Sequence, residues 1–208
     1  MPMHWKQQVQ LLEQEASFDI AIFLLEKVVK NNPNDVDAYI FLLFRLREMW
    51  LEGSVYWCNV SKDPLRDVKK EYYASKRDNY MAAAEKYFAE SYHRFSENPE
   101  YLYYAAHILG HIAWYFGASD DLQSDLELRA VRMRYNAVLN MIDYYKELYD
   151  KEPNNVDVIK YAASIVNDPS LQEQLATKGA AAEYVIGGEV SWAKKILEDA
   201  HKDKAESK

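Results

Sequence analysis

Apolar and polar residues follow one another along this chain with the period of an α-helix. Between residues 17 and 31 the apolar side chains recur three, four and seven positions apart, which places them on one helical face. Ser17 precedes this run, and its hydroxyl can cap the first turn. The helix is expected to stop before Pro33, because proline lacks an amide hydrogen and disfavours a helical residue before it. A second helix then begins with Asn34 or Asp35 as its cap.

The same period predicts helices along most of the chain. The helix from Asp35 to about Leu51 is apolar nearly all round, which suits a position between other helices. Segment 65–97 contains no glycine or proline and forms either one long helix or two that meet near 76–78. The remaining helices are predicted at 5–15, 100–116, 120–150, 156–166, 168–179, 180–186 and 189–201.

Two segments depart from the helical pattern. Residues 53–63 are too short for a domain and carry large apolar side chains such as Trp57, so we expect a packed insertion between hairpins. Residues 205–208 form a charged tail. The helix before this tail is apolar on one side only, as a C-terminal capping helix requires. The sequence thus predicts a single helical domain at 1–204.

The stretch Ser17–Tyr39 resembles the second helix and the linker of a tetratricopeptide repeat. Ala21 lies where this pattern has a small residue, and Pro33-Asn34 and Ala38 are in register with it. The resemblance implies an all-α fold of stacked antiparallel helical hairpins, of the α-solenoid type. It also implies a protein-binding role.

Two further stretches carry a looser form of the same pattern. Residues 144–155 are similar to the helix-to-linker signature, and Asn98-Pro99 repeats the break at Pro33. The intervals between Pro33, Pro99 and Pro153 are much longer than the family's repeat of about 34 residues. We therefore expect longer helices and insertions between the hairpins.

Composition and charge narrow the class of partner. The 17 tyrosines exceed the roughly 6 that average composition would give, and tyrosine suits both helix packing and partner interfaces. A net charge of −8 disfavours nucleic acid and an anionic membrane and favours a basic protein or peptide. No apolar run reaches membrane-spanning length and no signal peptide is visible, so we expect a cytoplasmic protein.

His107 and His111 are the residues with metal-binding spacing. They lie four positions apart in a predicted helix, but Ile108 stands where a zinc-hydrolase motif has its glutamate. The chain lacks a glycine-rich phosphate loop and a nucleophile elbow, and Cys58 is its single cysteine. We therefore expect no catalytic residues, no metal and no cofactor.

These observations favour a non-enzymatic module that binds a protein or peptide through an aromatic, acidic surface. One alternative is an immunity protein that neutralises a secreted bacterial toxin, such as a basic nuclease, by occlusion, because opposite charge speeds encounter. A second alternative is an all-helical metal-binding protein or enzyme that uses His107 and His111.

The position of the partner follows from the expected hairpins. In stacked hairpins the first helix of each pair lines the concave surface. Here these are the helices after Asp35 and after Pro99. We expect their core positions to be Leu42, Leu46, Ala105 and Ala106. The predicted partner-binding residues are then Tyr39, Trp50, Tyr101 and Tyr104, with Trp57 from the insertion, and Tyr103 can exchange roles with Tyr104.

Overall fold

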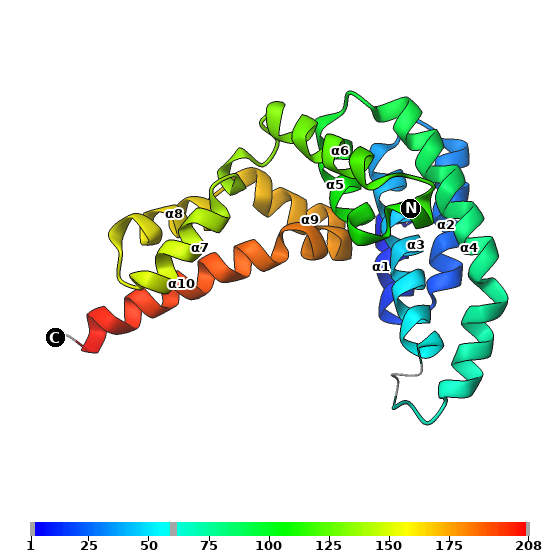
Figure 1. The fold of residues 1–208 in the computed structure, drawn as a ribbon, viewed down its shortest axis with the longest axis horizontal. Helices are drawn as coiled ribbons and strands as arrows, with labels where there is room; N and C mark the ends of the chain where they lie inside the picture. The colour runs from blue at the N-terminus through cyan, green and yellow to red at the C-terminus, as the bar shows by residue number, and fades with distance from the viewer. Residues whose placement is uncertain (1–2, 59–61, 207–208) are drawn as a thin grey trace. The chain divides into compact units, whose positions relative to one another are not determined.

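The computed structural model describes residues 3–58 and 62–206, and all regular structure in them is helical (Figure 1). The all-α prediction is therefore confirmed. The chain divides into two compact units, Met1–Ala130 (unit 1) and Val131–Lys208 (unit 2). Each unit is described by itself, and the single-domain boundary at 1–204 stays a prediction.

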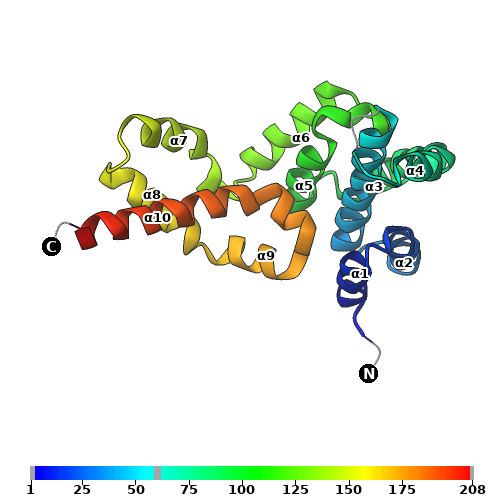
Figure 2. The same ribbon diagram turned by 90° about the horizontal axis from the view of Figure 1, so that it is seen from below.

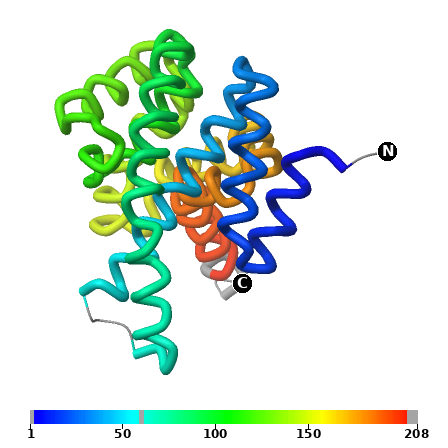
Figure 3. Tube along the Cα trace, turned by 90° about the vertical axis from the view of Figure 1, so that its right-hand side faces the viewer, coloured from blue at the N-terminus to red at the C-terminus, as the bar shows by residue number. Residues whose placement is uncertain are grey.

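Unit 1 is a set of helices that pack mostly against their neighbours in sequence. Its elements are α1 (Trp5–Gln14), α2 (Phe18–Asn31), α3 (Val36–Trp57), α4 (Arg66–Phe95), α5 (Pro99–Leu109), the 3₁₀ helix η1 (Gly110–Phe116) and most of α6 (Asp120–Arg132). Helix α1 packs on α2 and α2 on α3, while α3 also contacts α4 and α5 (Figures 1 and 3). Helix α3 therefore lies between other helices, as its apolar pattern predicts.

Side-chain caps fix where the main helices of unit 1 begin. The Asp35 carboxylate accepts a hydrogen bond from the Ala38 amide at 3.1 Å, which satisfies one of the orphan donors of α3. At α5, Asn98 accepts from the Tyr101 amide at 2.9 Å and Pro99 occupies the first helical turn. Ser17 precedes α2 but makes no side-chain hydrogen bond as a cap.

Helix α3 is longer than the sequence predicts. It continues through Gly53 to Trp57, so the predicted packed insertion is wrong for residues 53–57. A glycine inside a helix costs about 1 kcal/mol relative to alanine. Gly53 is buried, and α4 packs along α3, so tertiary contacts offset that cost. Asn59, Val60 and Ser61 lie outside the described residues. Helix α4 is one continuous helix, which decides between the two alternatives for segment 65–97.

The predicted helix at 100–116 is broken at Gly110. This glycine has φ 41° and ψ −132°, a conformation that a residue with a Cβ rarely adopts. The chain continues as η1 and ends at Gly117, whose φ of 66° is the left-handed cap that the sequence predicts.

Unit 2 holds the second group of helices (Figure 2). Helix α10 packs on α8 and on the π-helical turn η3. In chain order the elements are η2 (Ala137–Leu139), α7 (Ile142–Lys151), α8 (Val156–Val166), α9 (Pro169–Ala182), η3 (Glu183–Gly187) and α10 (Gly188–Glu206).

Three predictions in this part need correction. The predicted helix at 120–150 is broken between α6 and α7, where Arg134 and Asn136 have φ of 60° and 51°. The separate helix at 180–186 is instead the end of α9, which kinks at Gly179, followed by η3. The tail begins later than predicted, because α10 extends to Glu206; residues 207–208 lie outside the described part.

Two of the three proline-marked connections share one backbone conformation. The residues that end α2 and α7, Asn32 and Glu152, have φ and ψ of −134° and 79° and of −140° and 76°. In both connections the residue three positions later donates its amide back to that residue's carbonyl, at 3.1 and 3.0 Å. The break at Asn98-Pro99 differs, because Pro99 is already helical there.

Candidate functional site

Three of the five predicted partner-binding residues belong to the core of unit 1. The side chains of Tyr39, Tyr101 and Tyr104 are all 0% exposed, so the expectation that they line an open surface is wrong. Helices α3 and α5 pack against each other and against further helices, so several faces of each helix are covered. Leu42, Leu46, Ala105 and Ala106 are buried as predicted.

Hydrogen bonds hold two of these buried tyrosines in place. The Tyr39 hydroxyl donates to Glu90 Oε1 at 2.6 Å, and the Tyr101 hydroxyl lies 2.7 Å from Ser91 Oγ. Burial raises the pKa of both phenols well above the ordinary tyrosine value, so they stay neutral at physiological pH. Their contacts are those of a satisfied polar core.

The other two predicted residues, Trp50 and Trp57, meet at the surface of unit 1. Their ring centroids are 4.9 Å apart, and the ring of Trp114 from η1 lies 4.9 Å from Trp50 in an edge-to-face arrangement. Tyr115 supports the group from below, with its ring 5.1 Å from Trp50 and only 1% of its side chain exposed. We call Trp50, Trp57 and Trp114 the tryptophan cluster.

The tryptophan cluster is partly exposed to solvent. Trp114 is 51% exposed, while Trp50 and Trp57 are half-buried. The indole nitrogen of Trp57 is buried and has no hydrogen-bond partner among the described residues. Gly53 gives the Trp57 ring room, because a Cβ there would lie 2.7 Å from a ring carbon. Tryptophan is the residue type most enriched among the dominant contacts of protein interfaces.

Arg77 from α4 completes this surface. Its guanidinium carbon lies 5.8 Å from the ring centroid of Trp50 and 5.6 Å from that of Trp57, within the range of a cation–π interaction. Sequence reasoning missed both Arg77 and Trp114. The aromatic run after Gly110 marks Trp114 as unusual, but no signal in the sequence connects either residue to Trp50.

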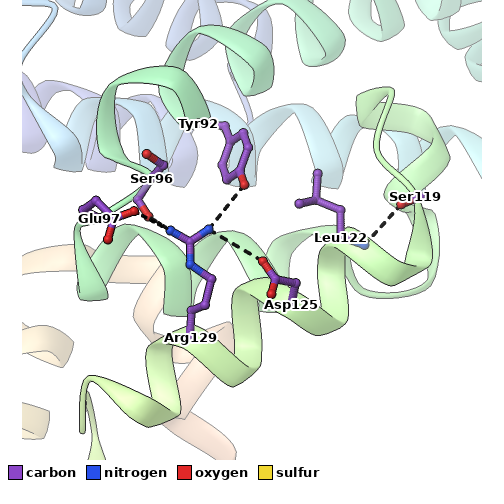
Figure 4. Close-up of polar contacts among 7 residues, drawn as sticks. All are labelled: Tyr92, Ser96, Glu97, Ser119, Leu122, Asp125 and Arg129. Carbon is purple, nitrogen blue, oxygen red and sulfur yellow. Dashed lines mark hydrogen bonds and ion pairs between the residues drawn. The ribbon is translucent and has the colours of Figure 1, made fainter.

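A groove of about 770 Å³ lies between α4, η1 and α6. Its floor includes Phe88 and Phe116, and Arg129 lines one side. As Figure 4 shows, the Arg129 guanidinium reaches back to the end of α4. It donates to the Ser96 carbonyl, to Glu97 at 2.8 Å and to the Tyr92 hydroxyl at 3.3 Å, and it lies 3.6 Å from Asp125.

The Arg129 network ties α6 to the end of α4. The two terminal nitrogens of the guanidinium are shared among two carboxylates and two other oxygens of the protein. Ser119 caps the start of the same helix by accepting from the Leu122 amide at 3.1 Å (Figure 4). The cation in this groove, Arg129, is therefore already paired with carboxylates of the protein, and we assign it a structural role.

A second groove, of about 520 Å³, lies between α1 and α2. Its apolar wall includes Leu11, Ile20 and Phe23, which are 46%, 56% and 56% exposed. Lys27 covers one face of Phe23, with the ammonium 4.1 Å from the ring centroid. This groove is the rival to the tryptophan cluster as a docking surface.

His107 and His111 do not share one regular helix. His107 is the third-last residue of α5 and His111 follows the break at Gly110, so the four-residue spacing no longer sets a chelating pair. The His107 ring lies 4.5 Å from that of Tyr103, and its Nδ1 is 2.8 Å from the Tyr103 carbonyl. Within residues 3–58 and 62–206, no three His, Cys, Asp or Glu side chains are grouped to hold a metal ion.

The comparisons with known proteins add no assignment. No protein family, no curated protein and no solved structure matches the chain. In the described part of the chain, no helix combines the length and the apolar character needed to cross a membrane.

Proposed function

We propose that this protein is a non-enzymatic binding module that takes up a protein or peptide partner on the tryptophan cluster. The observation that carries the proposal is Trp114, a tryptophan that is half exposed yet held in place by other rings. A large ring that is already ordered loses little conformational freedom on binding, which favours it as an anchor.

The surroundings of Trp114 support the same interpretation. Trp50 holds it edge to face, and Tyr115 packs under Trp50 from the core. The cluster draws on α3 and η1, which meet through the rings of Trp50 and Trp114, and α4, which carries Arg77, contacts both elements within unit 1. Such a surface is aromatic and flanked by arginine, the composition of interface anchors.

The resemblance to tetratricopeptide repeats fits this role. The two connections that end α2 and α7 have the same backbone conformation and the same amide-to-carbonyl bond, as expected of a repeated structural unit. We propose that the helical hairpins serve as a scaffold for the partner surface, as in that family.

The proposal is tested by comparing what wild-type protein and a Trp114→Ala variant recover from a lysate of the source organism. Phe23→Ala is the matched control, because Phe23 is a large exposed ring, 56% against 51%, in the rival groove. Proteins are quantified by mass spectrometry, and each variant is first shown to be folded by circular dichroism.

The expected result is a protein that wild type and Phe23→Ala recover equally and that Trp114→Ala loses. A partner lost with Phe23→Ala and kept with Trp114→Ala would move the docking surface to the groove between α1 and α2. Recovery that is the same for all three proteins would refute binding through the tryptophan cluster.

A further inference from the structure

Arg77 differs from the other arginines of unit 1. Each of the others lies within ion-pair distance of a carboxylate of this chain, namely Arg45 with Glu13, Arg47 with Glu48, Arg66 with Asp67, Arg94 with Glu90, and Arg129 with Glu97 and Asp125. Arg77 has no ion pair within the described part of the chain, and its side chain is exposed. It lies instead over Trp50 and Trp57.

The contact with tryptophan prepares this guanidinium for a ligand. A guanidinium is planar and carries five N–H donors in a fixed fork. The rings of Trp50 and Trp57 hold the group near the surface and reduce the freedom it would lose on binding. The geometry of the donors matches a carboxylate, which can accept two of them at once.

The charge of the whole chain does not decide the charge at one contact. The net charge of −8 is spread over 208 residues. At physiological ionic strength, charges are screened over about 8 Å, so the groups at the contact decide which partner is favoured. The charged group in contact with Trp50 and Trp57 is Arg77, which has no ion pair within the described part of the chain.

We propose that the tryptophan cluster binds an acidic, apolar segment of the partner protein. A glutamate or aspartate of that segment pairs with Arg77, and a neighbouring aromatic or large aliphatic side chain packs on the exposed ring of Trp114. This assignment rests on the proposed function and names the chemistry of its partner. It also replaces the basic partner that the net charge alone favours.

The test is a selection from a library of random twelve-residue peptides, displayed on phage as internal segments so that no peptide terminus is free. The full chain is the target, and peptides that also bind Trp114→Ala protein are removed. The expected enrichment is of peptides with Asp or Glu beside an aromatic or large aliphatic residue.

One recovered peptide and its Glu→Gln or Asp→Asn form are then titrated by fluorescence anisotropy. Arg77→Ala is expected to lower the affinity for the acidic peptide at least about tenfold, because a charge-assisted hydrogen-bonded pair is lost. The amide form should bind wild type and Arg77→Ala alike. The affinity of Arg77→Lys for the acidic peptide should lie between those of wild type and Arg77→Ala, since an ammonium keeps the charge but cannot form the two parallel hydrogen bonds of a guanidinium.

Arg66→Ala is the matched control, because Arg66 is a half-buried arginine of the same helix, α4, and is already paired with Asp67. It should leave affinity unchanged. Enriched peptides that depend on Trp114 but are basic, or that bind Arg77→Ala as well as wild type, would overturn the acidic partner and leave the proposed function standing. A selection that yields no peptide dependent on Trp114 or Arg77 would overturn both.

Discussion

Replacement of Tyr101 tests the finding that the tyrosines of α3 and α5 are core residues. The side chain is 0% exposed and its hydroxyl lies 2.7 Å from Ser91 Oγ. Truncating a buried aromatic residue to alanine costs about 3–5 kcal/mol, through lost burial and the cavity left behind. We expect a loss of this size in the free energy of unfolding of unit 1 for Tyr101→Ala.

Tyr101→Phe tests the contribution of the hydroxyl to stability apart from that of the ring. It keeps the ring and removes one hydrogen bond, while Ser91 Oγ keeps the Tyr87 carbonyl at 2.7 Å as a partner. Because no buried donor is left without a partner, the expected cost is only about 0.5–1.5 kcal/mol. Tyr144→Ala is the surface control, since Tyr144 is 56% exposed. It should change stability by less than about 1 kcal/mol.

The assay is urea unfolding followed by tryptophan fluorescence and by circular dichroism. Trp5, Trp50, Trp57 and Trp114 report on unit 1, and Trp192 on unit 2. With a slope of about 2 kcal/mol per molar urea, a loss of about 4 kcal/mol lowers the midpoint by about 2 M. If Tyr101→Ala and Tyr144→Ala unfold at the same urea concentration, Tyr101 is not in the core and the packing described for α5 is wrong.

Three further predictions concern the remaining features of the fold. Arg129→Ala should lower the stability of unit 1 by about 1 kcal/mol in a urea melt, and Arg129→Lys should lower it by less. If Arg129→Ala unfolds at the same urea concentration as wild type, the Arg129 contacts do not stabilise the packing of α6. Burial raises the pKa of Tyr161 to about 12, so the folded state holds the phenol proton more tightly than the unfolded state. The resulting contribution to the free energy of unfolding is present below about pH 10 and is lost as the pH rises towards 12. In urea melts across this range, the stability of wild type should therefore fall more steeply with pH than that of Tyr161→Phe, and identical slopes would contradict the raised pKa of this half-buried phenol. Gly110→Ala should lower the stability of the fold by about 1–3 kcal/mol because φ there is 41°. Gly188→Ala, at a helical φ of −60° with no neighbouring atom near the added Cβ, should be neutral or stabilising. Equal shifts of the melting temperature for the two variants would refute the strained turn at Gly110.

Most helix positions could be predicted because their signals are local. Asp35, Asn98 and Asp168 each cap the helix that follows by accepting from the amide three residues later, at 3.1, 2.9 and 3.0 Å. Apolar spacing on α2 identified its buried face correctly, including Ala21 and Leu25, which are 0% exposed. Such features depend only on residues within one or two turns of one another.

The missed breaks depend on contacts that local signals do not contain. Arg134 and Asn136 adopt positive φ without being glycine, so the end of α6 carries no ordinary stop signal. Asn136 is held there by Gln174, whose side-chain amide donates to it at 2.8 Å across 38 residues of sequence. The prediction at Gly53 fails in the opposite sense. Glycine there indicates a break, but α3 continues through it.

The candidate site could be predicted only in part, for a similar reason. Ring size and position in the sequence predict Trp50 and Trp57 as partner-binding residues, but Tyr39 and Tyr104 have the same features and are 0% exposed. A helix that packs on several sides has no single buried face, so periodicity does not tell which rings stay accessible. Trp114 joins the cluster through the fold alone, because it lies far from both in the sequence.

Site-specific photo-crosslinking tests the central claim, that the partner docks on the tryptophan cluster, most directly. Benzoylphenylalanine is introduced in place of Trp114, of Phe23 in the rival groove, or of Tyr144 on unit 2, and intact cells of the source organism are irradiated. The three side chains are 51%, 56% and 56% exposed, so they sample solvent to a similar degree. We predict one covalent adduct with a partner protein that forms from position 114 and is absent at positions 23 and 144. An adduct from position 23 or 144 with none from position 114 would contradict the account.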